Sequence, residues 1–370
     1  MADIDDAAYD DDPNYIAKSN SFAFKTQLSN RLKDFWEQRL NLVWLNVKRR
    51  YRDDPDSKDP LDAYDDWYYG NNKKIDWQNN FFISDMDTIT GGFEYEEERG
   101  AHRNVNRRTV NNKALYIQNQ LTLWEKSFTT LGIRVDDNQS FGSDINYKLS
   151  SSYLFERINT RLKSNFGTGF KAPSLFQLYD PTYGNSCLTP DESLSYDLAL
   201  EKNFTENVLV GAGYFHNLFK NMVDYDFDTN RYRNIGKAKT AGSELNFSIT
   251  PFKKNKIDCA YTRTNTRNNS TGKELARRPK DRFSLNIDWD LFKNLKITSS
   301  LNYFGHRWDN TSNTEKMKPY ARIDLSAGYK VTENFDIFCT IENLLNKKYE
   351  EVRGYATAGF SFFAGVKKTF

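Results

Sequence analysis

A two-residue alternation of apolar and polar side chains recurs from residue 19 to the end of this chain and constrains its fold more than any other feature. Ile145, Tyr147 and Leu149 share one phase, while Asn146 and Lys148 share the other. Successive side chains of a β-strand point to opposite faces, so a period of two predicts strands. Many of the stretches reach about ten residues or more, against five or six in typical globular sheets.

The alternation predicts seventeen strands, joined by connections of two kinds that strictly alternate. Short turns such as 125–126 and 331–332 are separated by longer polar loops such as 50–72 and 171–192. This arrangement is typical of a transmembrane antiparallel β-barrel with periplasmic turns and extracellular loops. The alternatives, a large soluble β-sandwich or a propeller, need neither strands of this length nor one-sided loops. The expected strands are 19–29, 34–49, 73–84, 87–97, 111–124, 127–137, 143–155, 160–170, 193–203, 206–222, 230–251, 254–266, 280–290, 293–306, 319–330, 333–342 and 359–370.

Composition excludes several classes of protein. The net charge of +2 gives no reason to expect a nucleic-acid partner. A mean hydropathy of −0.78, with no long apolar run, excludes transmembrane helices, whereas an aromatic content of 15% excludes a disordered chain. Cys187, Cys259 and Cys339 form no CxxC pair, so no disulfide framework or zinc site is indicated. The three histidines show no spacing that would assemble a catalytic site, and we expect no enzyme.

Strand parity suggests that the barrel is larger than this chain. Single-chain bacterial barrels have even strand numbers, and an open edge in lipid would leave backbone groups without hydrogen bonds. We therefore expect residues 1–370 to be the C-terminal part of a barrel that lacks an odd number of strands. Five further strands would give twenty-two, the size whose lumen is plugged.

Three segments carry a resemblance to a known family. Residues 165–179, NFGTGFKAPSLFQLY, followed by CLTPDES at 187–193, look like the central barrel motif of TonB-dependent outer-membrane receptors. Residues 341–349, IENLLNKKY, and GYATAG at 354–359 resemble the closing segment of that family, nearest its cobalamin-transporter branch. RRPK at 277–280 fits the same branch. The resemblance is specific from about residue 79 onward and weaker before it.

The resemblance implies a twenty-two-stranded barrel around an N-terminal plug in the outer membrane of a Gram-negative bacterium. TonB pulls a segment before the plug to admit a metal chelate such as cobalamin or a siderophore. Plug, TonB-contacting segment, signal peptide and first strands are not recognisable here, so we do not expect transport by this chain alone. The alternative is a plugless, passive, porin-like channel completed by another chain. The expected partners are outer-membrane lipid, the barrel-assembly machinery, a small-molecule chelate and, through a plug, TonB.

Three groups of residues are candidates for specific roles. Aromatic side chains in two long loops can stack on a planar or macrocyclic ligand, or they can pack loop against loop; they are Trp67, Tyr68, Tyr69, Phe176, Tyr179 and Tyr183. No cofactor is required, but clustered carboxylates can bind calcium, or they can be a solvated acidic loop; they are Asp3, Asp5, Asp6, Asp10, Asp11 and Asp12. The last strand resembles the signal read by the assembly machinery, through Phe360, Phe362 and Phe370.

Overall fold

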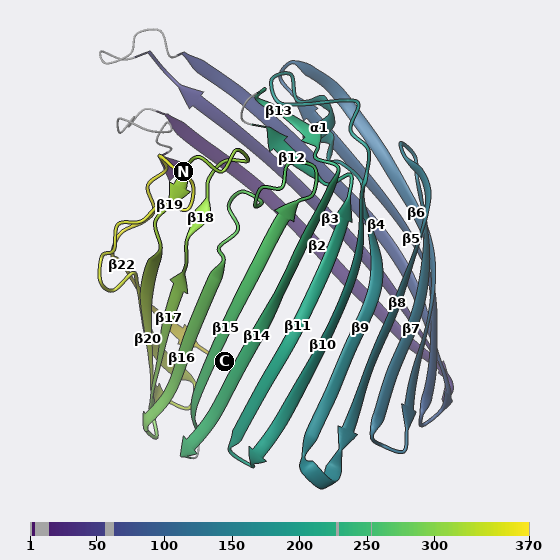
Figure 1. Ribbon diagram of the computed structural model, residues 1–370, viewed down its shortest axis with the longest axis vertical. Helices are drawn as coiled ribbons and strands as arrows, with labels where there is room; N and C mark the ends of the chain where they lie inside the picture. Colours follow the sequence, from purple (N-terminus) through teal and green to yellow (C-terminus); the bar gives the residue numbers. More distant parts are fainter. Residues whose placement is uncertain (1, 4–14, 56–62, 227–228, 253, 370) are drawn as a thin grey trace. The chain divides into compact units, whose positions relative to one another are not determined.

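A computed structural model describes residues 2–3, 15–55, 63–226, 229–252 and 254–369 (Figure 1). The side chains of residues 2 and 3 lie outside this description. Nearly all regular structure is strand, and no helix among the described residues is long and apolar enough to cross a membrane. The elements are β1 (Ala2–Asp3), β2 (Ile16–Lys33), β3 (Trp36–Asp53), β4 (Tyr64–Ser84), β5 (Asp87–His102), β6 (Val105–Leu123), β7 (Ser127–Asn138), β8 (Gly142–Phe155), η1 (Glu156–Ile158), β9 (Thr160–Lys171), α1 (Leu175–Tyr179), β10 (Asp191–Thr205), β11 (Val208–Lys220), β12 (Val223–Asp226), β13 (Arg231–Asn234), β14 (Lys237–Phe252), β15 (Asn255–Asn268), β16 (Asp281–Phe292), β17 (Leu295–Phe304), β18 (Arg307–Trp308), β19 (Lys316–Met317), β20 (Tyr320–Thr332), β21 (Phe335–Glu342) and β22 (Ser361–Lys368).

The prediction of seventeen long strands is confirmed, apart from the bounds described below; they are β2–β11, β14–β17 and β20–β22, and they lie with β1 in one sheet. Two compact parts can be distinguished, and all of the candidate site described below belongs to the first, residues 1–153, 164–196 and 217–238. Within it, each strand from β2 to β8 pairs antiparallel with the next along the chain. In the second part, β15, β16, β17, β20, β21 and β22 pair in the same manner.

One face of the first part is apolar and exposed. On β6, Leu115 is 63% exposed, and on β7, Ile133 is 47% exposed. These two strands pair Leu115 with Val135 and Ile117 with Ile133, so apolar side chains lie beside one another on this face. Among the described residues only eight hydrophobic side chains are buried, which is too few for the core of a soluble domain of this size. A continuous exposed apolar face on long strands is what a bilayer covers.

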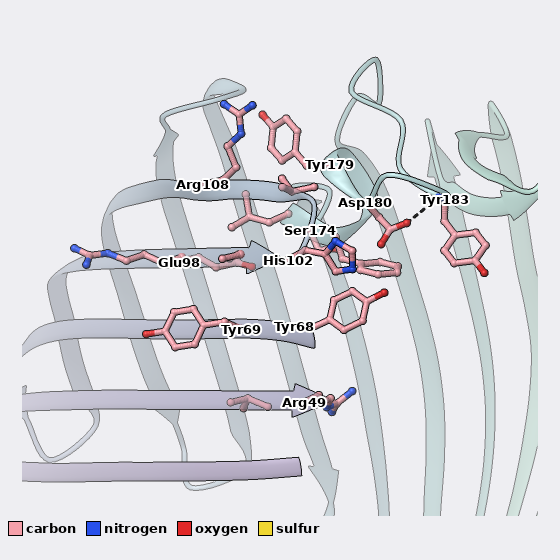
Figure 2. Close-up of a pocket in the computed structure, with 18 of the residues that line it drawn as sticks. Arg49, Tyr68, Tyr69, Glu98, His102, Arg108, Ser174, Tyr179, Asp180 and Tyr183 are labelled. Atoms are coloured by element: carbon pink, nitrogen blue, oxygen red, sulfur yellow. Dashed lines mark hydrogen bonds between the residues drawn. The ribbon is translucent and has the colours of Figure 1, made fainter. Parts of the chain in front are cut away.

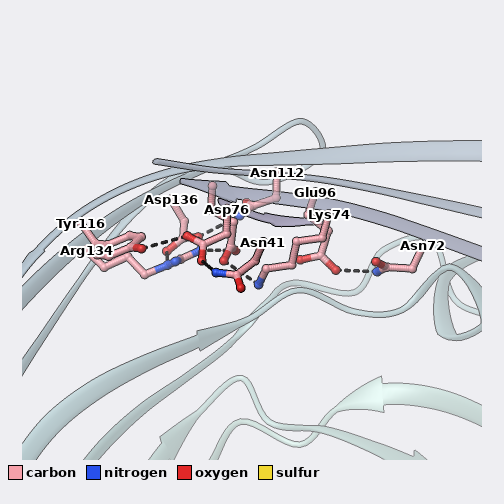
Figure 3. Close-up of polar contacts among 10 residues, drawn as sticks. Asn41, Asn72, Lys74, Asp76, Glu96, Asn112, Tyr116, Arg134 and Asp136 are labelled. Atoms are coloured by element: carbon pink, nitrogen blue, oxygen red, sulfur yellow. Dashed lines mark hydrogen bonds and ion pairs between the residues drawn. The ribbon is translucent and has the colours of Figure 1, made fainter. Parts of the chain in front are cut away.

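The opposite face carries a network of charges and amides (Figure 3). Glu94 is 8% exposed and pairs with Lys74 at 2.5 Å and with Arg134 at 2.8 Å. Arg134 also pairs with Asp136 at 2.8 Å, and the Tyr116 hydroxyl donates to Asp76 Oδ1 at 2.8 Å. The Tyr116 ring lies over Gly92, where a Cβ would approach Cζ to 2.3 Å. Polar groups alternate with lipid-facing ones along each strand, as in a barrel with a polar interior.

The prediction that short turns and long loops strictly alternate is wrong. On the loop side, β5 and β6 are joined by only two residues, 103–104, and β7 and β8 by residues 139–141. β3 continues to Asp53 and β4 begins at Tyr64, so most of the expected loop 50–72 is strand. These polar strand ends continue the backbone pairing above the apolar band, where the alternation that marks a membrane strand is lost.

The expected strand 230–251 is two strands. β13 pairs with the four-residue β12 in a hairpin, and β14 begins only at Lys237, after Gly236 with a φ of +73°. The glycine permits this left-handed backbone, which separates the hairpin from the long strand. The first expected strand begins at residue 19, but β2 begins at Ile16, and β1 pairs with Ile16 and Ala17 of β2.

Candidate functional site

A cavity of 590 Å³ lies at the loop ends of β3, β4 and β5 (Figure 2). Its walls also include the segment between β9 and β10, residues 172–190, which contains α1. Phe176, Tyr179 and Asp180 reach it from that segment, while Tyr68 and His102 reach it from β4 and β5. A volume of this size falls within the range of small-molecule sites, about 300 to 1,000 Å³.

The start of α1 is fixed by its own sequence. Ser174 Oγ accepts a hydrogen bond from the Gln177 amide at 3.2 Å, and Gln177 Oε1 accepts one from the Ser174 amide at 2.9 Å. This reciprocal capping box, with Ser174 directly after Pro173 as the N-cap, begins the helix at Leu175. Leu175 and Leu178 are buried, and a Cβ on Gly100 would come within 3.0 Å of Leu175 Cδ1. The glycine lets the helix approach the β5 backbone.

Hydrogen bonds join segment 172–190 to the β12–β13 hairpin. The Tyr232 amide donates to the Tyr183 carbonyl at 3.0 Å, and Asn185 Nδ2 donates to the Tyr232 carbonyl at 2.9 Å. Asn234 Oδ1 accepts from the Thr189 amide at 2.9 Å, and its Nδ2 donates to the Thr189 carbonyl at 2.9 Å. The hairpin therefore holds in place the segment that lines the cavity, although the two are about fifty residues apart in sequence.

Six aromatic rings run through this region and are called the aromatic row. Tyr68 lies 5.7 Å from Phe176, and Phe176 lies 6.1 Å from Tyr232, between ring centroids. Contacts of this spacing contribute about 0.5 to 1.5 kcal/mol beyond the buried area. In order, the aromatic row is Tyr51, Tyr68, Phe176, Tyr232, Tyr225 and Tyr183.

Charged groups are placed among these rings. His102 Nε2 lies 2.6 Å from Asp66 Oδ2, both side chains are buried, and the imidazole lies 4.4 Å from the Tyr68 ring. Arg108 places its guanidinium 4.9 Å from the Tyr179 ring centroid. Asp180, 8% exposed, accepts the Thr182 and Tyr183 amides at 3.0 and 2.8 Å. Rings, guanidinium groups and carboxylates suit a large ligand that has both apolar and polar surface.

Burial shifts the pKa of two tyrosines at the loop end of β4, above the apolar band. Burial, followed by the charge of Asp66, raises the pKa of Tyr64 to about 12. Burial also raises the pKa of Tyr68, with Tyr64 as the next cause. At neutral pH both hydroxyls keep their protons, and the Tyr64 hydroxyl donates to Asp66 Oδ2 at 3.2 Å.

Raising the pH from about 10 to about 12 is expected to loosen this end of the site. A folded-state pKa above that of the unfolded chain contributes stability that is complete below the unfolded value of 10.0 and is lost as the pH rises through the folded value. Tyr64→Phe removes the titrating hydroxyl and is expected to make the stability of this end less dependent on pH. Proteolysis of this end followed against pH, with tyrosinate absorbance, checks this. An unchanged profile in Tyr64→Phe would contradict it.

The structure brings together four of the six aromatic candidates, Tyr68, Phe176, Tyr179 and Tyr183, around one cavity. Tyr69 touches it as well, but the Tyr69 hydroxyl accepts Asn46 Nδ2 at 3.1 Å on the opposite sheet face. Trp67 is in phase with Tyr69 and borders a different hollow. Sequence reasoning missed His102, Asp180 and Tyr232, because no spacing in the chain links them.

The side chains of the acidic candidates lie outside the described residues. Asp5, Asp6, Asp10, Asp11 and Asp12, with the side chain of Asp3, lie outside the described residues, so calcium binding there stays a prediction. Two carboxylates at the start of β4 are already paired, Asp65 with Arg50 at 2.8 Å and Asp66 with His102. No group of three or more His, Cys, Asp or Glu side chains that could hold a metal occurs in the part of the chain that the structure describes.

The assembly candidates fall at the last strand. Phe362 lies in β22 with 59% of its surface exposed, and Phe360 precedes this strand with 51% exposed. Phe370 lies outside the described residues. β22 pairs with β21 through Phe362 and Ile341, so Phe362 lies beside another apolar side chain.

A family model decides the identity of the fold. The model described as "TonB dependent receptor-like, beta-barrel" matches residues 2–344. The chain belongs to the TonB-dependent receptor β-barrel family. Members of this family are receptors and transporters of the Gram-negative outer membrane, and the antiparallel barrel expected from the alternation is their fold.

Relatives of this TonB-dependent receptor barrel include the vitamin B12 transporter BtuB of Vibrio cholerae, 25% identical over 99% of this chain and 57% of the relative. Similar solved structures include a variant of the ferric enterobactin receptor PfeA of Pseudomonas aeruginosa, with a TM-score of 0.78, 17% identity and coverage of 96% of this chain and 62% of that one. The siderophore receptor PirA of Acinetobacter baumannii gives a TM-score of 0.75, 15% identity and the same coverages. This chain thus spans less than two thirds of these relatives.

Proposed function

We propose that this chain is part of an outer-membrane receptor for the energy-coupled uptake of a metal chelate, either cobalamin or a siderophore. In that receptor it forms part of the barrel wall, the extracellular loops and a surface that contacts the ligand. The observation that carries the proposal is the 590 Å³ cavity at the loop end of a TonB-dependent receptor barrel, which is lined by four rings of the aromatic row, Tyr51, Tyr68, Phe176 and Tyr183. Ligand sites of this kind are mostly apolar and have a few converging polar groups. Here Arg108, His102 and Asp180 supply those groups.

The choice of ligand class follows the relatives. One transports vitamin B12 and others are receptors for siderophores. Both ligands are bulky and present flat or macrocyclic apolar surface beside polar groups, which stacking aromatics and charged side chains can bind together. The chain contributes no catalysis in this proposal. Energy coupling, with TonB acting through a plug, is a property proposed for the whole receptor and not for residues 1–370 by themselves.

The direct test is ligand binding by the whole protein isolated from outer membranes, with cyanocobalamin and ferric enterobactin as probes. Saturable binding of one probe, at a Kd of micromolar or below and competed by the same probe unlabelled, supports the proposal. Liposome swelling with small sugars is the second arm. Rapid swelling together with binding of neither probe would contradict the receptor and favour the porin-like alternative.

Deleting Phe370 is expected to reduce the amount of assembled protein in the outer membrane. A terminal aromatic in phase with Phe360 and Phe362 fits recognition by the barrel-assembly machinery, our proposed partner in folding. Surface labelling and heat-dependent mobility on gels measure assembly. Phe363→Ala, on the other phase of the same strand, is the control. Equal surface amounts for the deletion and the unmodified protein would contradict the role of Phe370.

A further inference from the structure

Polar side chains interrupt the apolar outward face of the first part, close to the tight turns. Gln38 pairs with Asn79, which is in phase with the exposed Trp77 on β4. Asp87 and Asn119 share the phase of the exposed Ile117 through the register of β5 with β6. All of these polar residues are partly exposed. Together they are called the outward polar patch, which consists of Gln38, Asn79, Asp87 and Asn119.

The patch lies in the half of the wall nearest the tight turns. Asp87 is the first residue of β5, Gln38 is the third residue of β3, and Asn119 lies four residues before the end of β6. At about 3.3 Å per residue and a tilt of about 45°, Gln38 lies roughly 5 Å and Asn119 roughly 9 Å above their turns. Trp124 in the turn between β6 and β7 is 73% exposed, which is typical of the lipid–water interface. The patch therefore begins at this interface and reaches into the apolar layer.

The protein itself satisfies the polar groups of the patch only in part. Asn79 Oδ1 accepts hydrogen bonds from Trp36 Nε1 at 3.0 Å and from Gln38 Nε2 at 3.1 Å. Asn119 Nδ2 donates to Asp87 Oδ1 at 2.5 Å. Among the described residues, no cation pairs with Asp87 and no acceptor binds Asn79 Nδ2. Polar groups at the edge of hydrocarbon are costly to leave unpaired, so we expect a molecule from outside the chain to supply a cation and an acceptor.

An apolar hollow of 520 Å³ begins beside Asn119 and continues up the outward wall. Phe166 on β9 lines it and stacks on Tyr147 of β8, with 6.0 Å between the ring centroids. The rest of its lining includes two rows of register-paired residues on β6, β7 and β8; the lower row is Asn119, Leu131 and Leu149, and the upper row is Ile117, Ile133 and Tyr147. A hollow of aliphatic and aromatic side chains at this depth fits an acyl chain.

We propose that the outward polar patch and the hollow together bind one phospholipid with a primary ammonium headgroup, in the leaflet at the tight turns. The ammonium donates to the Asp87 carboxylate, an ester carbonyl accepts from Asn79 Nδ2, and an acyl chain lies in the hollow. From the turns upward, these three features follow the order of headgroup, glycerol esters and chains in a leaflet. The site is separate from the chelate cavity and does not depend on which chelate is bound.

Charge and symmetry favour this occupant over the alternatives. The negative charge of Asp87 attracts an ammonium group and repels an anionic headgroup. A second copy of this chain would form a two-fold interface with the same patch on both sides. Such an interface would place two Asp87 carboxylates close together without a cation between them.

The test measures lipid binding by the whole receptor in detergent, by native mass spectrometry with phosphatidylethanolamine and phosphatidylglycerol of equal chain length. The unmodified receptor is expected to bind phosphatidylethanolamine about tenfold more tightly, because a hydrogen bond to a charged group is a strong one. Asp87→Asn keeps the shape of the side chain but removes its charge, so this preference is expected to disappear. Heat-dependent mobility on gels verifies that each protein is folded.

Two further variants separate the headgroup from the acyl chain. Asp336→Asn is the matched control, because Asp336 is half-buried like Asp87 and is the second residue of β21 after a tight turn, but it is in phase with Thr340 and not with the apolar Ile337. It is expected to keep the full preference. Ile117→Trp fills the hollow and is expected to weaken binding of both lipids severalfold while the preference for phosphatidylethanolamine remains.

An undiminished preference in Asp87→Asn would overturn the proposal, as would an equal loss of preference in Asp336→Asn. Displacement of the lipid by millimolar ethanolamine would also overturn it, since the occupant would then be a free amine. A receptor that stays dimeric after removal of lipid and becomes monomeric in Ile117→Trp would assign this face to a second copy of the chain instead.

Discussion

Phe176→Ala is expected to lower the affinity of the whole receptor for its chelate by about tenfold to a hundredfold. Phe176 lines the cavity and connects the Tyr68 ring on β4 with the Tyr232 ring on β13, so its removal takes a ring from the cavity wall and interrupts the aromatic row. An aromatic side chain buries about 150 to 250 Å² and supplies much of a ligand's contact energy. Equilibrium binding of cyanocobalamin and of ferric enterobactin measures the effect.

Phe166→Ala is the matched control for this substitution. Phe166 and Phe176 are both 39% exposed, but Phe166 stacks on Tyr147 on the apolar outward face. Its loss removes a ring of the same size from the lipid side and is expected to leave affinity unchanged within about twofold. Equal affinities of Phe176→Ala and the unmodified protein would show that the aromatic row only packs loop against loop.

Ile133→Arg is expected to destabilise the folded barrel by about 2 to 4 kcal/mol, the cost of a cation near the bilayer midplane. Ile133 lies six residues beyond Ser127, the first residue of β7 at its tight turn. At about 3.3 Å per residue and a tilt of about 45°, this is roughly 14 Å into an apolar layer of about 25 to 30 Å. Urea-dependent folding into lipid vesicles measures the free energy of unfolding.

Gln118→Arg places the same charge on the neighbouring strand but on the polar face. Gln118 pairs with Gly132 and is in phase with Tyr116, whose hydroxyl contacts Asp76 in the inward network. We expect this substitution to change the free energy of unfolding by less than about 1 kcal/mol, because a polar lumen solvates the guanidinium. Similar costs for both substitutions would contradict the assignment of the lipid face.

The period of two was sufficient to predict the seventeen long strands, since one face of each must meet lipid and the other must not. The sequence phase predicts that Ile133, Leu115 and Trp77 face outward, because a bilayer requires apolar side chains on the outer face of every strand. The alternation does not extend above the apolar band. There, backbone pairing extends β4 to its start at Tyr64 and β6 to its start at Val105. These strand ends carry no alternation of apolar and polar side chains, so the sequence pattern does not predict them.

The aromatic candidates show that the local sequence pattern does not predict which loop side chains reach the cavity. Tyr68 and Tyr69 are neighbours in sequence and look equivalent there, yet strand geometry sends Tyr68 to the cavity and the Tyr69 hydroxyl to Asn46 on the opposite face. The chain composition and phase determined a barrel with one apolar and one polar face. Only the tertiary structure brought His102 and Asp180 to one cavity and Tyr232 against the segment that lines it, because segments far apart in sequence meet there through contacts that no local pattern encodes.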